Sequence, residues 1–337
     1  MGAAFWRRLL LQAVSALLVV GTLCFVMAES LPGDAAYRIA AGRYGYDLVD
    51  AAAAEAVRAE LGLDRPAAAR WLQWLGQLLQ GQAGVSMVLG EPVTALVAHQ
   101  LGHTLWLSAV AWLMALVLGL GLGLWAAARP HGGISRSVEA AMTALRATPA
   151  FLIGIGLSAL LAVQAGWLPV AGHEDPEHVI LPALTLALAL CPGFTQVVRE
   201  AARRVLDSEA YTFAQVKGLP PAVALRRHAL PQILLGTLAY AGVQLVLLVE
   251  GMVVVETLFA WPGIGHALVH AVIARDVPMV QGTALTMALL FVLLHGAIDA
   301  LHLGLDPRLR TGGTGAAAPA TRTAQPAPTR GEDRCAT

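Results

Sequence analysis

Histidines and acidic residues at helical spacing are the side chains of this sequence that could bind a cation or carry protons. His295, Asp299 and His302 follow the spacing i, i+4, i+7, which places them on one face of a helix. Imidazole suits nickel, but three positions on one helix spread over about 10 Å along its axis, too far for a single metal ion. We therefore predict no metal site and interpret this face as hydrogen bonding between helices. A cation or proton pathway is the alternative.

Two glutamates are candidates for a transport pathway. Glu250 lies inside a long apolar segment and Glu256 lies at its end. Ionisable groups inside a membrane are costly and often serve transport, so both glutamates, with His295 and Asp299, are candidate contacts with a pathway or a partner subunit. A hydrogen-bonded structural role is the alternative for Glu250. Two histidine pairs at i, i+4 receive the structural interpretation: His99 with His103, and His266 with His270.

Nucleotide chemistry is excluded by the near absence of lysine. A P-loop requires Gly-Lys-Ser/Thr, whereas the single lysine of the chain, Lys217, is followed by Gly218. The sequence contains no HExxH or GxSxG motif, and its three cysteines are isolated rather than paired at metal-ligand spacing. We therefore expect a chain that is not an enzyme and binds no cofactor of its own.

The composition is that of an integral membrane protein. Hydrophobic residues make up 57% of the chain and charged residues 13%, against about 25% charged residues in soluble domains. A membrane-spanning helix needs about 20 mostly apolar residues. Six segments meet this requirement and predict an all-α protein with six transmembrane helices: 9–28, 104–128, 138–165, 179–198, 233–255 and 282–304. Three prolines could kink these helices: Pro149, Pro182 and Pro192.

Arginine placement predicts the orientation. Arg7 and Arg8 precede the first apolar segment, as basic residues do in a secretory signal. The segment has about 20 residues, however, whereas the apolar region of a signal peptide usually has roughly 7–15, so we expect a helix that is retained. With the N-terminus inside, the inside segments hold 15 basic residues and the short outside loops hold one. The positive-inside rule then makes both termini cytoplasmic.

This orientation divides the chain into four parts. An N-terminal helix (1–28) is followed by an extracytoplasmic region (29–103), a five-helix core (104–304) and a cytoplasmic tail (305–337). In the second part, Trp71 and Trp74 are predicted to lie at the membrane interface or to pack within a small cap. The tail is rich in Gly, Ala, Pro and Thr, which predicts disorder.

A polar, basic segment interrupts the core at 199–232 and contains "YTFAQVKGLPPAVALRRHALPQ". Its alanines and charged residues favour a helix that ends at Gly218, because glycine accepts a positive φ without steric cost. Pro220 and Pro221 start a second short helix, and Pro231 is expected to end it before the next span. The segment thus predicts a helix–turn–helix on the cytoplasmic face that a partner could hold in a groove.

This segment resembles the EAA loop of binding-protein-dependent ABC transporter permeases, whose pattern is EAA-x3-G-x9-I-x-LP. Four residues match in register: Ala214, Gly218, Leu230 and Pro231. Three depart from the general pattern: Thr212, Phe213 and His228. The run "A-x-x-KGL…RRHALP" is instead similar to the dipeptide, oligopeptide and nickel branch of the family, and residues of this run such as Lys217, Leu219 and Arg227 join the resemblance.

Other stretches extend the resemblance over about 300 residues, up to about Thr311. "WLGQLLQGQAGVSMVLGEPV" is similar to the first outside loop of that branch, "HVILPALTLAL" to its third-to-fourth helix connection, and "VVVETLFAWPGIGHALVHAVIARDVPMVQG" to its C-terminal third. Each match is weak alone, and their order along the chain makes them specific.

The resemblance implies an inner-membrane permease with the MetI-like bundle of type I ABC importers. Such a subunit forms half of a pathway with a second homologous permease, usually a paralogue, within the membrane lipid. Two ATPase subunits use ATP and Mg²⁺ and each hold one EAA loop, and an extracytoplasmic binding protein delivers the substrate; no nucleic acid is involved. Di- or oligopeptides are the expected substrates and nickel, free or chelated, is the alternative. A receptor or assembly subunit that transports nothing is the alternative of another class.

Overall fold

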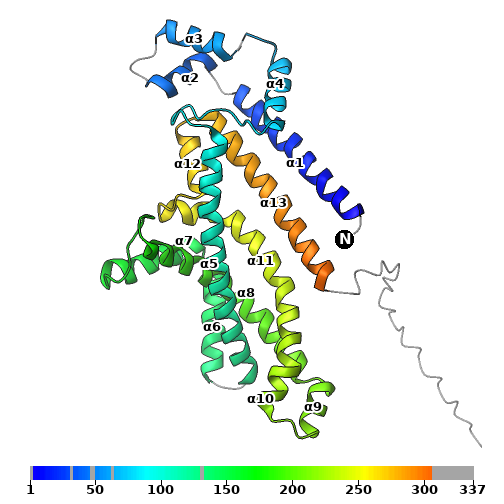
Figure 1. The fold of residues 1–337 in the computed structure, drawn as a ribbon. Helices are drawn as coiled ribbons and strands as arrows, with labels where there is room; N and C mark the ends of the chain where they lie inside the picture. The colour runs from blue at the N-terminus through cyan, green and yellow to red at the C-terminus, as the bar shows by residue number, and fades with distance from the viewer. Residues whose placement is uncertain (1–2, 31–32, 46–49, 62–63, 130–132, 306–337) are drawn as a thin grey trace, which may run out of the picture.

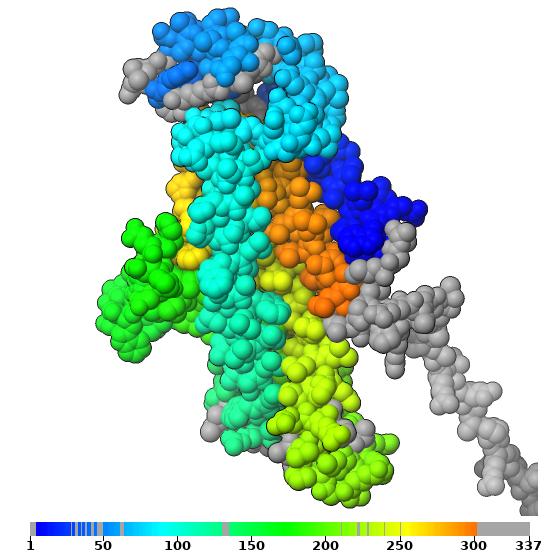
Figure 2. Space-filling view, in the orientation of Figure 1, coloured from blue at the N-terminus to red at the C-terminus, as the bar shows by residue number. Residues whose placement is uncertain are grey.

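A computed structural model describes residues 3–30, 33–45, 50–61, 64–129 and 133–305 of the chain. All named elements of this described part are helices, and the predicted all-α class is confirmed. Helices α2 (Ala35–Tyr44), α3 (Ala51–Leu61) and α4 (Ala67–Leu79) lie at one end of an elongated molecule, which we call the cap end (Figure 1). Helices α9 (Glu209–Val216) and α10 (Pro221–Ala224) lie at the opposite end, the loop end (Figure 2). The predicted disordered tail lies outside the described residues.

The helices between the two ends are long and apolar. They are α1 (Ala3–Ser30), α5 (Val93–Ala128), α8 (Ile180–Leu206), α11 (Leu230–Leu258) and α13 (Val277–Leu305). Each contains a segment long and apolar enough to cross a membrane, and a bent pair of helices makes a sixth candidate. Helix α5 has 36 residues, or about 54 Å at 1.5 Å per residue, so it begins well before the predicted residue 104 and extends beyond a hydrocarbon core of about 30 Å.

The third predicted span, 138–165, is not one continuous helix. Helix α6 (Gly133–Ala147) stops before Pro149, and α7 (Ala150–Leu157) continues into a π-helical segment, η2 (Ser158–Gln164). The two parts meet at an angle of 110°. Pro149 lacks the N–H that a continuous helix needs, and its ring pushes Thr148 out of the helical region. The predicted kink at Pro149 is therefore confirmed, and it is sharp enough to break the span.

Helix α8 is the centre of the bundle and packs along α5. Phe194 and Val198 of α8 are fully buried where they face Gly119 and Gly123 of α5. A Cβ atom at Gly119 would lie 2.3 Å from the Phe194 Cβ, and one at Gly123 would lie 2.7 Å from the Val198 Cβ. Glycines at these positions let the two backbones approach closely, as small residues do between membrane helices.

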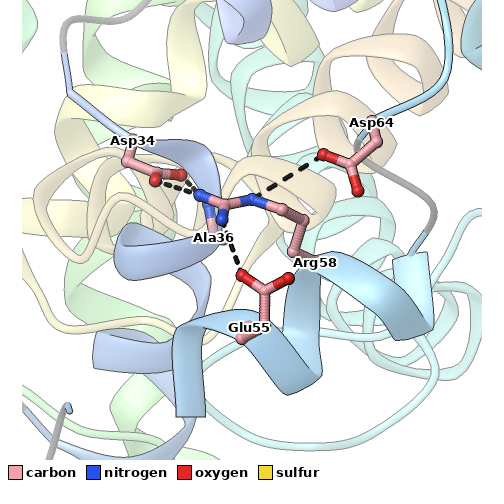
Figure 3. A network of polar contacts seen from close by, with 5 residues as sticks. All are labelled: Asp34, Ala36, Glu55, Arg58 and Asp64. Atoms are coloured by element: carbon pink, nitrogen blue, oxygen red, sulfur yellow. Dashed lines mark hydrogen bonds and ion pairs between the residues drawn. The ribbon is translucent and has the colours of Figure 1, made fainter. Parts of the chain in front are cut away.

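The cap end is held together by an arginine that several carboxylates surround (Figure 3). Arg58 of α3 forms ion pairs with Asp34 and with Glu55, the latter at 2.8 Å, and its Nε lies 3.9 Å from Asp64. Asp34 also accepts a hydrogen bond from the Ala36 N–H at 2.9 Å and thereby caps α2. The nearby charge of Asp34, opposed by desolvation and aided by Glu55 and Asp64, raises the pKa of Arg58. Arg58 therefore joins the start of α2 to α3.

Helix α4 packs against α1 rather than standing alone. The Trp74 ring lies 6.3 Å from the Phe25 ring, centroid to centroid, and its edge would be 2.9 Å from a Cβ at Gly21. Arg70 of α4 forms an ion pair with Glu29 at the end of α1. These contacts join the cap to the N-terminal helix, and the two predicted roles of the tryptophans stay predictions.

Candidate coupling loop and polar residues of the bundle

The loop end begins with a capped turn between two helices. Helix α8 ends at Leu206, and Ser208 adopts an extended conformation and accepts a hydrogen bond from the Tyr211 N–H at 3.3 Å. Serine is a favoured N-cap because its hydroxyl satisfies a free N–H in the first turn. The helical stretch that the sequence predicts up to Gly218 is therefore divided into the end of α8 and the separate α9.

The turn predicted at Gly218 is confirmed. Its φ is +85°, in the region that favours glycine. The N–H groups of Lys217 and Gly218 donate to the carbonyls of Phe213 and Gln215 at 3.0 and 2.9 Å, which closes α9. The chain then reverses at Pro220, whose carbonyl accepts from the Val223 N–H at 2.9 Å in the first turn of α10.

The prediction that Pro231 ends the second helix is wrong. Helix α10 continues through a π-helical turn, η4 (Leu225–Ala229), directly into α11, with Pro231 in the first turn of α11. In this turn the Leu230 N–H donates to the Leu225 carbonyl, a residue further back than in an α-helix. We attribute the continuation to this wider turn, which gives room to the proline ring where it would meet the preceding turn of an α-helix.

The loop end presents apolar and basic side chains to its surroundings. Phe213 and Val216 of α9 are 59% and 78% exposed, whereas Ala214, between them, is buried. Lys217 lies 4.6 Å above the Phe213 ring, and Arg226 and Arg227 are exposed in η4 (Leu225–Ala229). An exposed apolar surface bordered by positive charge is typical of a docking site for another protein.

The residues predicted for coupling do not all lie on this surface. Thr212, Lys217, Gly218, Arg227 and Pro231 are exposed, Leu219 and Leu230 are half-buried, and Ala214 is buried; the side chain of His228 lies outside the described part. The buried Ala214 leaves room for the loop to fold back on itself. The exposed members are the ones that a partner subunit could touch directly.

Glu256 is fully buried at a junction of three helices near the cap end. Its carboxyl group accepts hydrogen bonds from the Thr104 hydroxyl of α5 at 2.7 Å and from the N–H groups of Gly265 and His266 at 2.8 and 3.2 Å. The Ile264 N–H donates in turn to the Thr104 hydroxyl at 2.8 Å. Glu256 and Thr104 together cap α12 (Ile264–Ile273), a short helix between the fifth and sixth predicted spans.

The other predicted polar residues are dispersed. His295 is exposed on α13, with its ring 4.0 Å from that of Phe291 and its Nδ1 3.1 Å from the Phe291 carbonyl. Asp299 is also exposed, and the side chains of Glu250 and His302 lie outside the described part. Their contacts with a pathway or partner stay predictions, as does that of Glu256.

Histidine pairs lie in contact but form no metal cluster. The rings of His99 and His103 are 4.8 Å apart and those of His266 and His270 are 4.4 Å apart, centroid to centroid. Among the residues that the structure describes, no group of three His, Cys, Asp or Glu side chains could hold a metal ion. The pairs therefore follow from helical spacing alone.

Sequence reasoning missed a second buried carboxylate. Asp276 is buried, accepts hydrogen bonds from the Ser86 hydroxyl and from the Met279 N–H, the latter at 3.2 Å, and thereby joins the loop before α5 to the start of α13. The signal was present, because an aspartate followed two residues later by proline, here Pro278, is typical of a helix start.

The fold and the exposed loop are those of a transporter membrane subunit, and comparison with known proteins agrees. Residues 119–311 match the family described as "Binding-protein-dependent transport system inner membrane component". The chain belongs to this family. Its members are membrane components of ABC transporters and are not enzymes.

Curated relatives resemble the chain over nearly its whole length. The chain is 34% identical over 306 residues to the glutathione transport system permease protein GsiC of Pectobacterium atrosepticum, covering 91% of this chain and 98% of that protein. It is 33% identical over 302 residues to GsiC of Salmonella paratyphi A, covering 89% and 97%. These relatives place the chain in the peptide branch of the ABC permeases.

Two solved structures show the same fold. An inward-facing MetNI methionine ABC transporter covers 63% of this chain and 96% of its own matching chain, at 19% identity and a TM-score of 0.52. An amino acid ABC transporter with histidines covers 63% and 94%, at 16% identity and a TM-score of 0.51. The chain is thus a multi-pass inner-membrane permease, and membership of this family implies ATPase and substrate-binding components as partners.

Proposed function

We propose that this chain forms half of the translocation pathway of an importer for di- or oligopeptides. The observation that carries the proposal is the exposed helix–turn–helix at 208–229, which presents Phe213, Val216 and basic residues at the end of the bundle farthest from the cap. ATPase partners would hold this loop and couple ATP hydrolysis to transport through it. The relatives named as glutathione permeases support a peptide, because glutathione is a tripeptide.

The remaining partners and the orientation belong to the same proposal. A second, homologous permease completes the pathway, two ATPases bind at the loop end, and an extracytoplasmic binding protein approaches the cap end. ATP and Mg²⁺ are used by the ATPases, and this chain binds no cofactor. The excess of basic residues in the loops at the loop end supports cytoplasmic termini.

Two alternatives remain weaker. Nickel import draws support from the contacting histidine pairs, but a pair supplies only two of the ligands that a metal site needs. A receptor or assembly subunit without transport would have no use for an exposed apolar loop that an ATPase can hold. Peptide import accounts for both the loop and the relatives.

The test is purification of the chain from detergent-solubilised native membranes, with identification of the proteins that accompany it. Recovery of a second permease and ATPases, followed by ATP-dependent uptake of labelled di- and tripeptides into proteoliposomes, is expected. Uptake of nickel but not of peptides would favour the first alternative. Recovery of this chain alone, under conditions that keep a known ABC complex intact, would contradict the proposal.

A further inference from the structure

Two polar stripes face each other in the loop-end half of the bundle. On α8, the polar residues recur at i, i+3, i+4 and i+7, which places them on one face of the helix: Gln196, Arg199, Glu200 and Arg203. On α6, they recur at i, i+4 and i+7: Glu139, Thr143 and Arg146. The stripes are in contact, because Arg146 donates to the Gln196 side-chain oxygen at 2.8 Å and Arg199 forms an ion pair with Glu139.

These stripes line a cavity of about 470 Å³ between α5, α6 and α8. Its apolar walls include Ala126 of α5 and Met142 of α6, and Pro192 closes it toward the middle of α8. The volume lies within the range of small-molecule sites, roughly 300–1,000 Å³. A cavity with polar groups on two sides and apolar walls between them has the general build of such a site.

Part of the hydrogen-bonding capacity in this cavity is unused. Within the described part of the chain, the side chain of Arg203 makes no hydrogen bond or ion pair, although it is half-buried. The Nε of Arg199 is buried and has no acceptor there. A buried donor without a partner is costly, so the Arg199 Nε indicates that an acceptor from outside the chain belongs in the cavity, and the half-buried Arg203 offers that acceptor a positive charge.

The charges define the chemistry of that ligand. Three arginines and two glutamates line the cavity, so it offers sites for both an anionic and a cationic group. A simple anion would meet Glu139 and Glu200, and a metal cation would meet the arginines. A small zwitterion carries both charges and matches both sets of side chains.

We infer that this α6–α8 cavity binds the transported peptide as a zwitterion on its way to the loop end. Arg203 and the Arg199 Nε bind the carboxylate, and Glu200 accepts hydrogen bonds from the ammonium group. This inference rests on the proposed function, whose substrate it makes more specific: a short peptide with both ends free. A phosphatidylethanolamine headgroup carries the same pair of charges, and the test separates the two sources.

Neighbouring arginines provide a matched pair for the experiment. The full-length chain is placed in phosphatidylcholine nanodiscs and titrated with radiolabelled trialanine. Arg203→Gln removes an arginine whose side chain has no partner among the described residues, so folding is expected to survive. Arg204→Gln is the control, because Arg204 is exposed and does not line the cavity. We expect Arg203→Gln to weaken binding about tenfold through loss of a charge-assisted contact and Arg204→Gln to leave it unchanged.

Capped peptides and a change of lipid complete the test. N-acetyl-trialanine and trialanine amide, each lacking one charge, are expected to bind at least about tenfold more weakly than trialanine. Equal affinities for the two arginine variants, equal binding of capped and free peptides, or no trialanine binding to the unaltered chain would each overturn the inference. Retention of phosphatidylethanolamine that depends on Arg203, with no peptide binding, would assign the cavity to lipid and also overturn it.

These outcomes differ from a failure of the proposed function. If the assembled transporter imports peptides and the Arg203→Gln complex does so with unchanged concentration dependence, the cavity lies off the pathway while peptide import stands. If the assembled transporter imports no peptide, the proposed function fails, whatever binds in the cavity.

Discussion

Glu256 shows how a single acidic residue can be fully buried and still be well accommodated. Its carboxyl oxygens receive a hydroxyl from α5 and two backbone N–H groups from the start of α12. Space is limited as well, because a Cβ atom at Gly263 would lie 2.0 Å from the Glu256 Oε1. The run "ETLFAWPGIG" is thus one unit. Glu256 caps α12, and the glycines let the start of α12 come close to the glutamate carboxyl group.

We predict that Glu256→Gln destabilises the chain. In the glutamine side chain an NH2 group, a donor, replaces one of the two carboxyl oxygens. This donor faces the Thr104 hydroxyl or backbone N–H groups that need an acceptor, which costs on the order of 1–3 kcal/mol of folding stability. The measurement is thermal unfolding of the detergent-purified chain, followed by size-exclusion fluorescence. Glu174→Gln, an exposed position, is the control. Equal melting temperatures for the two variants would show that the cap contributes nothing.

Gly218 controls the turn of the loop through its backbone alone. With φ at +85° and no atom within 4 Å of its added Cβ, a side chain there meets open space but an unfavourable conformation. We predict that Gly218→Val lowers peptide transport strongly while ATP hydrolysis continues, because a β-branched residue resists positive φ. Gly218→Asn, which tolerates this region better, should retain most of the transport. Both rates are measured in the same proteoliposomes, and full transport by the valine variant would contradict this account.

Two secondary-structure elements depart from regular α-helix at prolines, with opposite results. At Pro149 the helix breaks and the chain turns by 110°. At Pro231 the helix continues, because the π-helical turn η4 precedes the ring. The second arrangement makes α10, η4 and α11 one continuous body. A force applied to the loop end can therefore pass along α11 toward the junction at Glu256.

We predict that the exposed face of α9 touches the ATPase subunit. Val216→Cys in a cysteine-free background should crosslink to the ATPase, because Val216 is 78% exposed at the loop end. Leu79→Cys is the control, since Leu79 is 73% exposed but lies at the cap end. Crosslinked products are identified by mass spectrometry of isolated membranes. Absence of the crosslink at position 216 in an assembled complex would argue against docking at α9.

The whole molecule has two chemically different ends joined by the apolar bundle. Helices α2 to α4 form the cap end, and the basic, apolar helix–turn–helix forms the loop end (Figure 2). A membrane around the bundle therefore places the two ends on opposite sides. The distribution of arginine and lysine predicts that the loop end faces the cytoplasm.

This orientation predicts opposite labelling of the two ends. A membrane-impermeant maleimide should label Leu79→Cys in intact spheroplasts and Val216→Cys only after permeabilisation. The cysteine-free chain reports the background, and labelling after permeabilisation confirms that both sites react. The reverse pattern would show that the termini lie outside the cytoplasm.

Much of the architecture could be predicted from the sequence because it depends on local composition. Apolar length determines the spans, and the positive φ of Gly218 follows from residue type and spacing. Sequence reasoning also identified Pro149 as a kink. It placed the end of the second loop helix wrongly, because the π-helical turn that accommodates Pro231 is not visible in residue type alone.

Contacts between polar residues far apart in the sequence depend on the folded bundle and cannot be predicted from local composition. Glu256 and Thr104 are far apart in the sequence, as are Ser86 and Asp276, and Glu139 and Arg199. Each pair forms because the folded chain brings two distant segments together, helices in some cases and loops in the case of Ser86 and Asp276. Helical spacing predicted single faces correctly, as for His99 and His103. Which faces oppose each other is a property of the folded bundle, as where the glycines of α5 meet Phe194 and Val198 of α8.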